Sequence, residues 1–212
     1  MLRLYDYWES GNCYKIRLLL SQLETPFERV AVDILAGETR TPAFLAKNPN
    51  HRVPFVEWPD GRCLTESNAI LFYLARGSDY LPDDAWAQAQ ILAWQNFEQY
   101  SHEPYIAVMR FWAFADRLEL NKELIPGKME GGYHALDVME GHLKGKRFFV
   151  GERYSIADIS LYAYTHVADE GGFDLSPYPE VRGWLTRVES QPRHVELTAD
   201  VGTRVEWPEN AA

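Results

Sequence analysis

The residues of this chain whose types and spacing could do chemistry lie in three short stretches, Ser10-Gly11-Asn12-Cys13, Val53-Pro54 and Glu66-Ser67. A hydroxyl at the start of a helix, such as that of Ser10, can donate a hydrogen bond to a thiolate. Lowering a thiol pKa of about 8.5 by about two units requires about 2.7 kcal/mol. A hydrogen bond to a charged group supplies about 1.5–3 kcal/mol, and the positive end of a helix adds to it. Ser10 could therefore stabilise a thiolate without a metal or a base.

The other two stretches are suited to binding a peptide-like molecule. Ser67, with the free N–H groups of a helix start, could bind a carboxylate, and Glu66 could bind an ammonium group. A γ-glutamyl group carries both charges side by side. If the Val53-Pro54 bond is cis, the N–H and C=O of Val53 would face the pocket and could pair with an extended peptide. Together the stretches predict a pocket for a γ-glutamyl tripeptide thiol.

Each of these residues also has a structural interpretation. Ser10 could simply cap a helix, and Ser67 could do the same. Ser10 and Cys13 have the spacing of a redox Cys-x-x-Cys whose first cysteine is replaced, so dithiol exchange within the motif is impossible. Cys13 could still act as a monothiol, but the pattern favours a small apolar residue facing a sheet. His51 and Arg52 could bind a second carboxylate or lie in solvent.

Composition restricts the classes of function. The 212 residues carry a net charge of −10, from 21 basic and 31 acidic residues, which argues against general affinity for nucleic acids or anionic membranes. No apolar run is long enough to span a membrane, and residues 1–10 are too polar for a signal peptide, so we expect a cytoplasmic protein. The two cysteines and six histidines form no metal-binding pattern, and no metal is expected.

Hydrophobic periodicity predicts two domains. Strands are expected over residues 2–7, 27–32, 54–58 and 62–64, and helices over 12–23, 41–46 and 66–76. The turn residues Pro59-Asp60-Gly61 predict that the last two strands form a hairpin. The order β-α-β-α-β-β-α over residues 1–77 fits a small α+β domain of thioredoxin-like type. Residues 77–84, with Asp83 and Asp84, are predicted to form a solvated linker.

Residues 85–212 are predicted to form an all-helical domain. Its helices are expected over 85–115, 118–143, 155–169 and 178–190, with a break or kink at Pro104 and a weak point at Gly131-Gly132. Ser155 and Asp158 form a predicted capping box, in which Asp158→Ala should cost about 0.5–2 kcal/mol. The tail over 192–212 shows little periodicity.

With these motifs in this order, the chain resembles the cytosolic glutathione transferase family over nearly its whole length. The resemblance implies a thioredoxin-like N-terminal domain, an all-α C-terminal domain and a homodimer. Ser10 matches the activating serine of the serine-type, bacterial-like classes. Val53-Pro54 resembles the pair that binds the cysteinyl unit, and Glu66-Ser67 matches the γ-glutamyl site.

The family also implies roles for further residues. His51 resembles a histidine that binds the glycine carboxylate, and Arg52 stands where other members use Lys or Gln. Asn12 resembles a residue that assists thiol binding and could share or replace the role of Ser10. Asp6 occupies the position of the activating tyrosine of other classes, with Tyr5 and Tyr7 on either side. An aromatic and apolar cluster is expected to bind the second substrate between the domains: Trp8, Tyr105, Met109 and Trp112.

The leading hypothesis is a glutathione S-transferase that transfers the thiolate of its co-substrate glutathione to a small hydrophobic electrophile. A glutathione-dependent isomerase, dehalogenase, disulfide reductase or peroxidase is an alternative within the enzymes. A protein-interaction module of the same fold is the non-enzymatic alternative, and it predicts weak glutathione binding or an occluded pocket. The substrate itself is not specified by the pattern.

Overall fold

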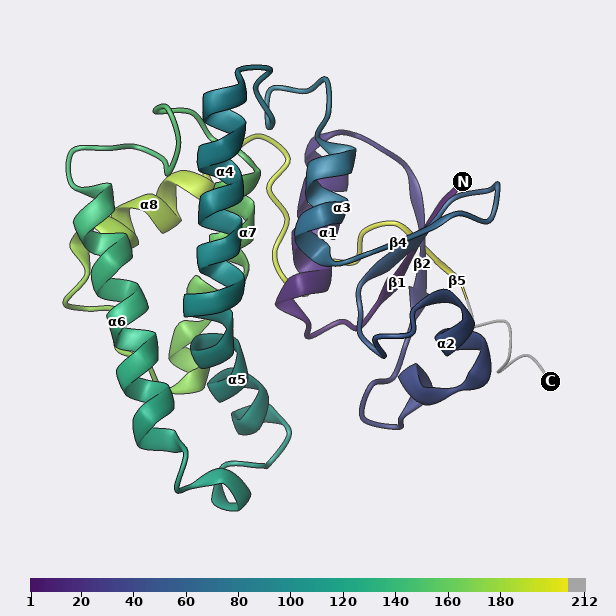
Figure 1. Ribbon diagram of the computed structural model, residues 1–212, viewed down its shortest axis with the longest axis horizontal. Coiled ribbons are helices and arrows are strands. Elements are labelled where there is room, and N and C mark those ends of the chain that lie inside the picture. The colour runs from purple at the N-terminus through teal and green to yellow at the C-terminus, as the bar shows by residue number, and fades with distance from the viewer. Residues whose placement is uncertain (206–212) are drawn as a thin grey trace. The chain divides into compact units, whose positions relative to one another are not determined.

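The computed structural model describes residues 1–205 of the chain and divides it into two compact units (Figure 1). The first unit combines Met1–Arg76 with the C-terminal segment that starts at Pro192, and the second is Gly77–Gln191. Among the described residues, none of the helices is both long enough and apolar enough to cross a membrane.

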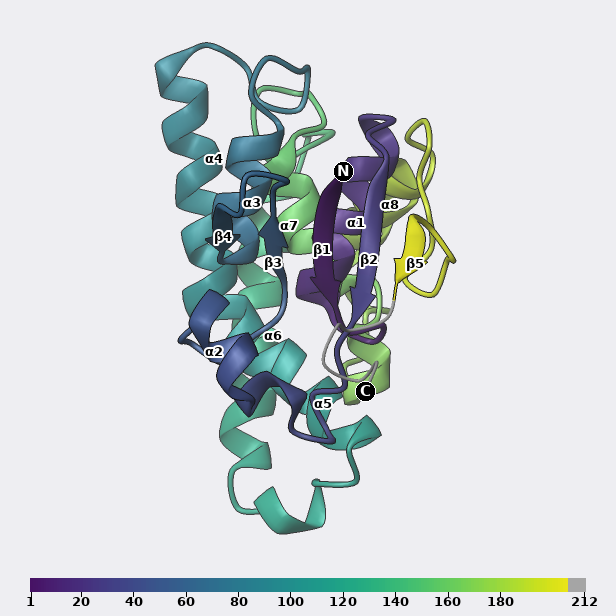
Figure 2. The ribbon, with the colours of Figure 1, turned by 90° about the vertical axis from the view of Figure 1, so that its right-hand side faces the viewer.

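The first unit is a five-stranded mixed sheet with helices on both faces. The sheet order is β4-β3-β1-β2-β5, in which β1 runs parallel to β2 and antiparallel to β3, and β3 and β4 form the expected hairpin (Figure 2). The thioredoxin-like arrangement predicted for this part is confirmed. Its elements are β1 (Leu2–Asp6), α1 (Gly11–Gln22), β2 (Phe27–Ala31), η1 (Glu38–Arg40), α2 (Pro42–Lys47), β3 (Phe55–Glu57), β4 (Cys63–Thr65), α3 (Ser67–Leu74) and β5 (Thr203–Val205).

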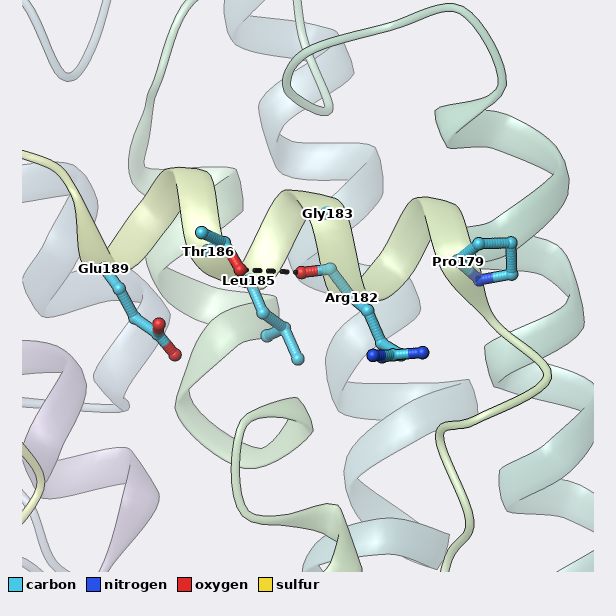
Figure 3. A pocket seen from close by; sticks show the side chains of 6 residues that line it. All are labelled: Pro179, Arg182, Gly183, Leu185, Thr186 and Glu189. Carbon is cyan, nitrogen blue, oxygen red and sulfur yellow. Dashed lines mark hydrogen bonds between the residues drawn. The ribbon is translucent and has the colours of Figure 1, made fainter.

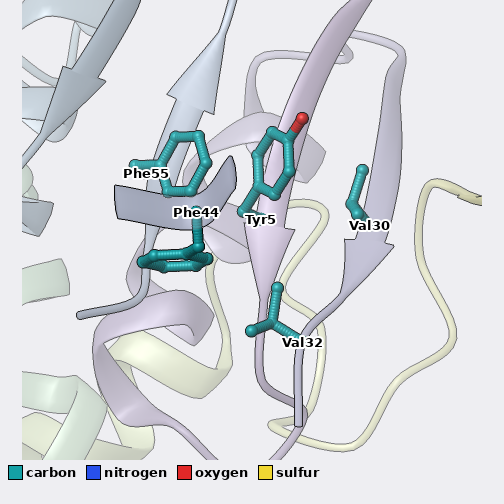
Figure 4. Packing of buried hydrophobic residues seen from close by; sticks show 5 residues of the cluster. All are labelled: Tyr5, Val30, Val32, Phe44 and Phe55. Carbon is teal, nitrogen blue, oxygen red and sulfur yellow. The ribbon is translucent and has the colours of Figure 1, made fainter. Parts of the chain in front are cut away.

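The alternation of β1 separates two kinds of interior. Tyr5 points to the face covered by α2, where its ring stacks on Phe55 with centroids 3.9 Å apart and Phe44 packs edge-on against Phe55 (Figure 4). The next residue, Asp6, points to the opposite face and meets Arg17 of α1. The apolar core under α2 and a charged contact under α1 therefore fix the sheet from both sides.

The C-terminal segment contradicts the predicted domain boundary. Residues 192–205 do not extend a helical domain over 85–212, because β5 pairs in parallel with β2 and Leu197 is buried in the first unit. Three strand residues in a polar segment leave no measurable periodicity, so sequence patterning missed this strand. The part of the predicted domain over 206–212 lies outside the described residues.

The second unit is all-helical, as predicted. The helix expected over 85–115 is interrupted by a π-helical turn, η2 (Glu98–His102), immediately before Pro104, which occupies the first turn of the next helix. The other elements are α4 (Ala85–Phe97), α5 (Glu103–Phe114), η3 (Glu119–Asn121), α6 (Ile125–Leu143), α7 (Ile156–Thr165), η4 (Ala168–Gly171) and α8 (Pro179–Glu189).

Asp84 and Gly131-Gly132 have structural roles in the second unit that the sequence patterns did not indicate. Asp84 is not only a linker residue, because its Oδ2 accepts the Ala87 N–H at 2.8 Å and caps α4. The helix α6 is continuous through Gly131-Gly132, so the predicted weak point is not a break in the helix. A Cβ at either position would lie 2.3 Å from the ring of Tyr105 or Phe173, so the two glycines are where aromatic rings pack directly onto the helix backbone.

The capping box of α7 is formed and extends into the core. Asp158 is completely buried, and its carboxylate accepts the N–H of Ser155 at 2.9 Å, the N–H of Phe149 at 3.1 Å and the Trp184 indole N–H at 2.9 Å. Burial raises the pKa of Asp158 to about 6, and these hydrogen bonds oppose the rise. The residue thus joins the start of α7 to α8.

Loss of this carboxylate should destabilise the protein more than loss of a helix cap alone. Asp158→Ala leaves three buried N–H groups without acceptors, so the free energy of unfolding should fall by about 3–5 kcal/mol in urea denaturation. The matched control is Asp174→Ala, which should cost about 1 kcal/mol or less, since exposed Asp174 accepts hydrogen bonds from Ser176 alone within residues 1–205. Equal losses in the two variants would contradict this account.

Candidate functional site

Ser10 lies at the start of α1 and is partly exposed. Its Oγ accepts the Cys13 N–H at 3.3 Å and caps the helix, while its own N–H donates to the Tyr7 carbonyl at 3.0 Å. Accepting this bond leaves the Ser10 O–H able to donate to another group, because a hydroxyl is both donor and acceptor. Capping and thiolate binding are therefore compatible roles for one side chain.

Cys13 lies inside the protein, three residues further along α1. It is 0% exposed, and its Sγ accepts the Tyr7 N–H at 3.4 Å. Burial raises the pKa of the Cys13 thiol far above its usual range, with the Asp6 carboxylate as the next cause. A buried, protonated thiol has neither the access nor the charge that a nucleophile needs, which supports the interpretation of Cys13 as an apolar residue facing the sheet.

The start of α3 meets the start of α1. The Ser67 hydroxyl donates to Asn12 Oδ1 at 3.0 Å, and Lys15 Nζ donates to Ser67 Oγ at 3.4 Å. Lys15 is 0% exposed. A buried ammonium group and the N-termini of two helices thus converge on one serine, and all of them favour a negatively charged ligand group.

Glu66 precedes α3 in a backbone conformation that side chains rarely adopt, with φ 67° and ψ 112°. Its carboxylate is exposed and accepts the Asn50 side-chain N–H at 3.2 Å. His51 and Arg52 are exposed in the same loop, which buried Asn48 shapes by donating to the Arg52 carbonyl at 2.7 Å. The predicted ammonium-binding carboxylate and the two predicted cations therefore lie on one connected loop and helix start.

The Val53-Pro54 peptide bond is cis and immediately precedes β3. Because Phe55 pairs with Tyr5, the preceding residues Val53 and Pro54 lie at the carboxyl end of β1, where the loop to Ser10 begins. Among the described residues, no hydrogen bond involves the Val53 N–H or C=O. These two backbone groups are available to an extended peptide.

Tyr5 is excluded as a thiol-activating residue by its surroundings. Its hydroxyl donates to Glu57 at 2.6 Å and accepts from Lys47 at 3.1 Å, inside the core under α2. Burial and the bond to Glu57 raise the pKa of Tyr5 to about 12. The hydroxyl therefore has neither access to a ligand nor a tendency to ionise.

The residues predicted to bind the electrophile have different surroundings. Trp8 follows β1 in the first unit, with its ring 4.1 Å from the Arg29 guanidinium carbon. On α5 of the second unit, Met109 is buried and packs next to Gly171, whereas Tyr105 and Trp112 are partly exposed. The prediction that these four residues bind a second substrate stays a prediction.

A separate pocket lies on the surface of α8 and contains none of the predicted site residues. Its volume is about 550 Å³, and Figure 3 shows the Thr186 hydroxyl donating to the Arg182 carbonyl within it. All of its lining residues come from that one helix: Pro179, Arg182, Gly183, Leu185, Thr186 and Glu189. Within residues 1–205, no group of three or more His, Cys, Asp or Glu side chains is placed to hold a metal ion.

Sequence reasoning missed three polar residues at this site. Lys15, Asn48 and Asn50 were not singled out, although they contact Ser67, Arg52 and Glu66 respectively. Lys15 lies on a helix whose residues are almost all buried, but lysine is usually a surface residue, so no local pattern distinguishes it. Asn48 and Asn50 act through a loop conformation that has no periodic signature.

Comparison with known proteins agrees with this geometry. Residues 1–76 match the family model "Glutathione S-transferase, N-terminal domain", and residues 96–192 match "Glutathione S-transferase, C-terminal domain". This chain belongs to the glutathione S-transferase family. The end of the second match at residue 192 coincides with the point where the chain returns to the first unit.

Family members of known structure and sequence extend the comparison. The crystal structure of a glutathione S-transferase from Pseudomonas fluorescens is 56% identical, covers 93% of this chain and 99% of its own, and has a TM-score of 0.91. A second family member from that species, solved with two glutathione bound, is 27% identical over 91% of this chain and 89% of its own, with a TM-score of 0.78. Elongation factor 1-gamma of Danio rerio is 32% identical over 93% of this chain, which spans only 46% of that protein.

The burial of Cys13 predicts the pattern of thiol modification. In the native protein, iodoacetamide should modify partly exposed Cys63 and leave Cys13 unmodified, as read by mass spectrometry of peptides. Cys63→Ser should then take up no label until the protein is unfolded in urea, when it should take up one. Rapid native labelling of Cys13 would show that this thiol is accessible and reactive.

Proposed function

We propose that this protein is a glutathione transferase whose N-terminal unit binds glutathione and stabilises its thiolate through Ser10. The observation that carries the proposal is the difference in surroundings among the three groups that could act at the thiol, which lie at the end of β1 and the start of α1. The Ser10 hydroxyl retains a donor at a helix start, whereas Tyr5 is held in the core and Cys13 is buried. The glutathione-bound family member from Pseudomonas fluorescens supports glutathione as the ligand.

Each part of glutathione has a matching group in the unit. The γ-glutamyl carboxylate would bind Ser67 beside Lys15 and the N-terminus of α3, and its ammonium would bind Glu66. The cysteinyl backbone would pair with the N–H and C=O of Val53, in the manner of an added strand. His51 and Arg52, the basic residues directly before Val53, would bind the glycine carboxylate. Asn12, whose Oδ1 accepts the Ser67 hydroxyl, would assist at the thiol.

The proposed reaction is a nucleophilic displacement by the bound thiolate. The thiol proton leaves to solvent on binding, and the Ser10 O–H and the positive end of α1 stabilise the negative sulfur that remains. The sulfur electron pair forms a bond to an electrophilic carbon of the second substrate, and the leaving group departs with its bonding pair. The protein supplies orientation and anion stabilisation, and glutathione supplies the nucleophile.

The alternatives make different demands on the same residues. A reductase that uses Cys13 as a monothiol requires an accessible thiol, which the burial of that residue opposes. An interaction module, an option raised by the similarity to elongation factor 1-gamma, has no need for a complete set of glutathione contacts. The convergence of Asn12, Lys15 and Ser67 favours a ligand-binding role. The homodimer and the cytoplasmic location stay predictions.

An ultraviolet difference titration of bound glutathione across pH tests this function. In the wild type, thiolate absorbance should appear about two pH units below the pKa of free glutathione, and Ser10→Ala should shift it back by about one to two units. Ser190→Ala is the matched control, because that exposed serine lies at the end of α8 in the second unit, where its hydroxyl donates to the Arg187 carbonyl at 2.9 Å.

Three results are informative in this titration. Loss of the low-pH thiolate signal in Ser10→Ala alone establishes serine activation. Binding with an unchanged signal in Ser10→Ala would assign activation to another group, with Asn12→Ala as the next variant. The absence of glutathione binding in the wild type would contradict the transferase and favour the interaction module.

A further inference from the structure

The C-terminal strap, residues 192–205, lies along α1 and the edge of the sheet in the first unit (Figure 2). The Tyr14 hydroxyl donates to the Val195 carbonyl at 2.7 Å, and Ser21 donates to the Arg193 carbonyl at 3.0 Å. Further along, β5 of the strap pairs with β2, and Gly202 lies against the ring of Phe27. The strap is thus fixed to elements that precede it by about 170 residues or more.

Arg17 connects the strap to the loop that carries Ser10. This arginine is 0% exposed, and its Nη2 donates both to the Leu197 carbonyl at 2.8 Å and to the Trp8 carbonyl at 2.9 Å. Its Nη1 donates to the Asp6 carboxylate at the end of β1. One rigid guanidinium group therefore holds the strap, the strand end and the loop in a fixed relation.

Arg29 makes a second connection between the same parts. Its Nη2 donates to the Asp200 carboxylate of the strap at 2.8 Å, and its Nε lies 4.0 Å from Asp6. The guanidinium carbon lies 4.1 Å from the centre of the Trp8 ring. The Trp8 residue is therefore held twice, at its carbonyl by Arg17 and at its ring by Arg29.

Trp8 is two residues from Ser10, and the loop between them is short. The Ser10 N–H donates to the Tyr7 carbonyl, so the position of the hydroxyl depends on the backbone from Tyr7 to Ser10. Small displacements of a group that stabilises a reacting anion weaken its effect strongly. A segment that is remote in sequence can therefore influence the thiolate through the two arginines and Trp8.

We propose that the C-terminal strap positions the thiol-binding loop, with Leu197 and Asp200 acting through Arg17 and Arg29 on Trp8 and thereby on Ser10. The inference rests on the proposed glutathione chemistry, and it assigns to the strap a role in thiolate stabilisation. Leu197 and Asp200 are positioning residues, since neither belongs to the proposed glutathione contacts. Residues 192–205 are then part of the machinery of the N-terminal unit.

A matched pair of lysine substitutions in the full chain tests the strap. Leu197→Lys puts a cation at a buried apolar position on the residue whose carbonyl binds Arg17, and it should displace the strap from Arg17. Thr198→Lys adds the same charge at the adjacent exposed residue and should change nothing. A second, milder pair is Asp200→Asn, which removes the partner of Arg29, with exposed Glu196→Gln as its control.

The readouts are the apparent pKa of the bound glutathione thiol and the kinetics with chlorodinitrobenzene. Leu197→Lys should raise the thiol pKa by about half a unit or more and lower kcat/KM for glutathione by about three- to tenfold. Asp200→Asn should also raise the thiol pKa and lower kcat/KM, each by a smaller amount than Leu197→Lys. Thermal unfolding of each variant identifies those that remain folded, and Asp200→Asn decides the matter if Leu197→Lys does not fold.

The outcomes separate this inference from the function on which it rests. A wild type that forms thiolate, with a raised thiol pKa in the strap variants and not in their controls, supports the positioning role. Folded strap variants with the wild-type thiol pKa overturn it and leave the proposed function intact. A wild type that forms no thiolate overturns both, and that result is seen before any variant is measured.

Discussion

Two buried cations on one helix are the constraint on which the first unit depends. Lys15 and Arg17 of α1 are both 0% exposed, and a buried charge without compensation costs several kcal/mol. The surroundings of each must therefore supply acceptors. Arg17 obtains them from Asp6, the Trp8 carbonyl and the Leu197 carbonyl, while Lys15 donates to Ser67 at the start of α3.

Compensation of these charges arranges the site. Asp6 is the last residue of β1, and Trp8 lies in the loop that follows it. The bonds from Arg17 to the Asp6 carboxylate and the Trp8 carbonyl therefore fix the path of the loop that leads to Ser10, the cap of α1. Because Ser67 begins α3, the contact with Lys15 brings the N-termini of two helices to one place. Burial raises the pKa of the Asp6 carboxyl, and the neighbouring guanidinium groups of Arg17 and Arg29 oppose that rise.

The order of elements in the first unit and the all-helical second unit could be predicted because their information is local. Apolar spacing gave α1 and β2, the turn at Pro59-Asp60-Gly61 gave the β3–β4 hairpin, and Ser155 with Asp158 marked the start of α7. The same local patterns placed Ser10, Glu66 and Ser67 at helix starts, where the structure also has them.

The features that could not be predicted depend on contacts between distant parts of the chain. The return of residues 192–205 to the first unit rests on Arg17, Arg29 and Tyr14, each far away in sequence. Gly131 looks like a weak point in a helix until Tyr105 is known to lie against it. Lys15 resembles an ordinary surface lysine until the burial of its whole helix is known.

The most direct test of the central claim is a calorimetric titration of glutathione into Lys15→Met. If the buried ammonium beside Ser67 creates the carboxylate site, this substitution should weaken glutathione binding by about tenfold, or about 1.4 kcal/mol, at neutral pH. Lys47→Met removes a lysine that pairs with Glu57 and Tyr5 instead, and it should leave the affinity unchanged. Wild-type affinity in folded Lys15→Met would contradict the account, because the charge that organises the two helix starts would then contribute nothing to the ligand.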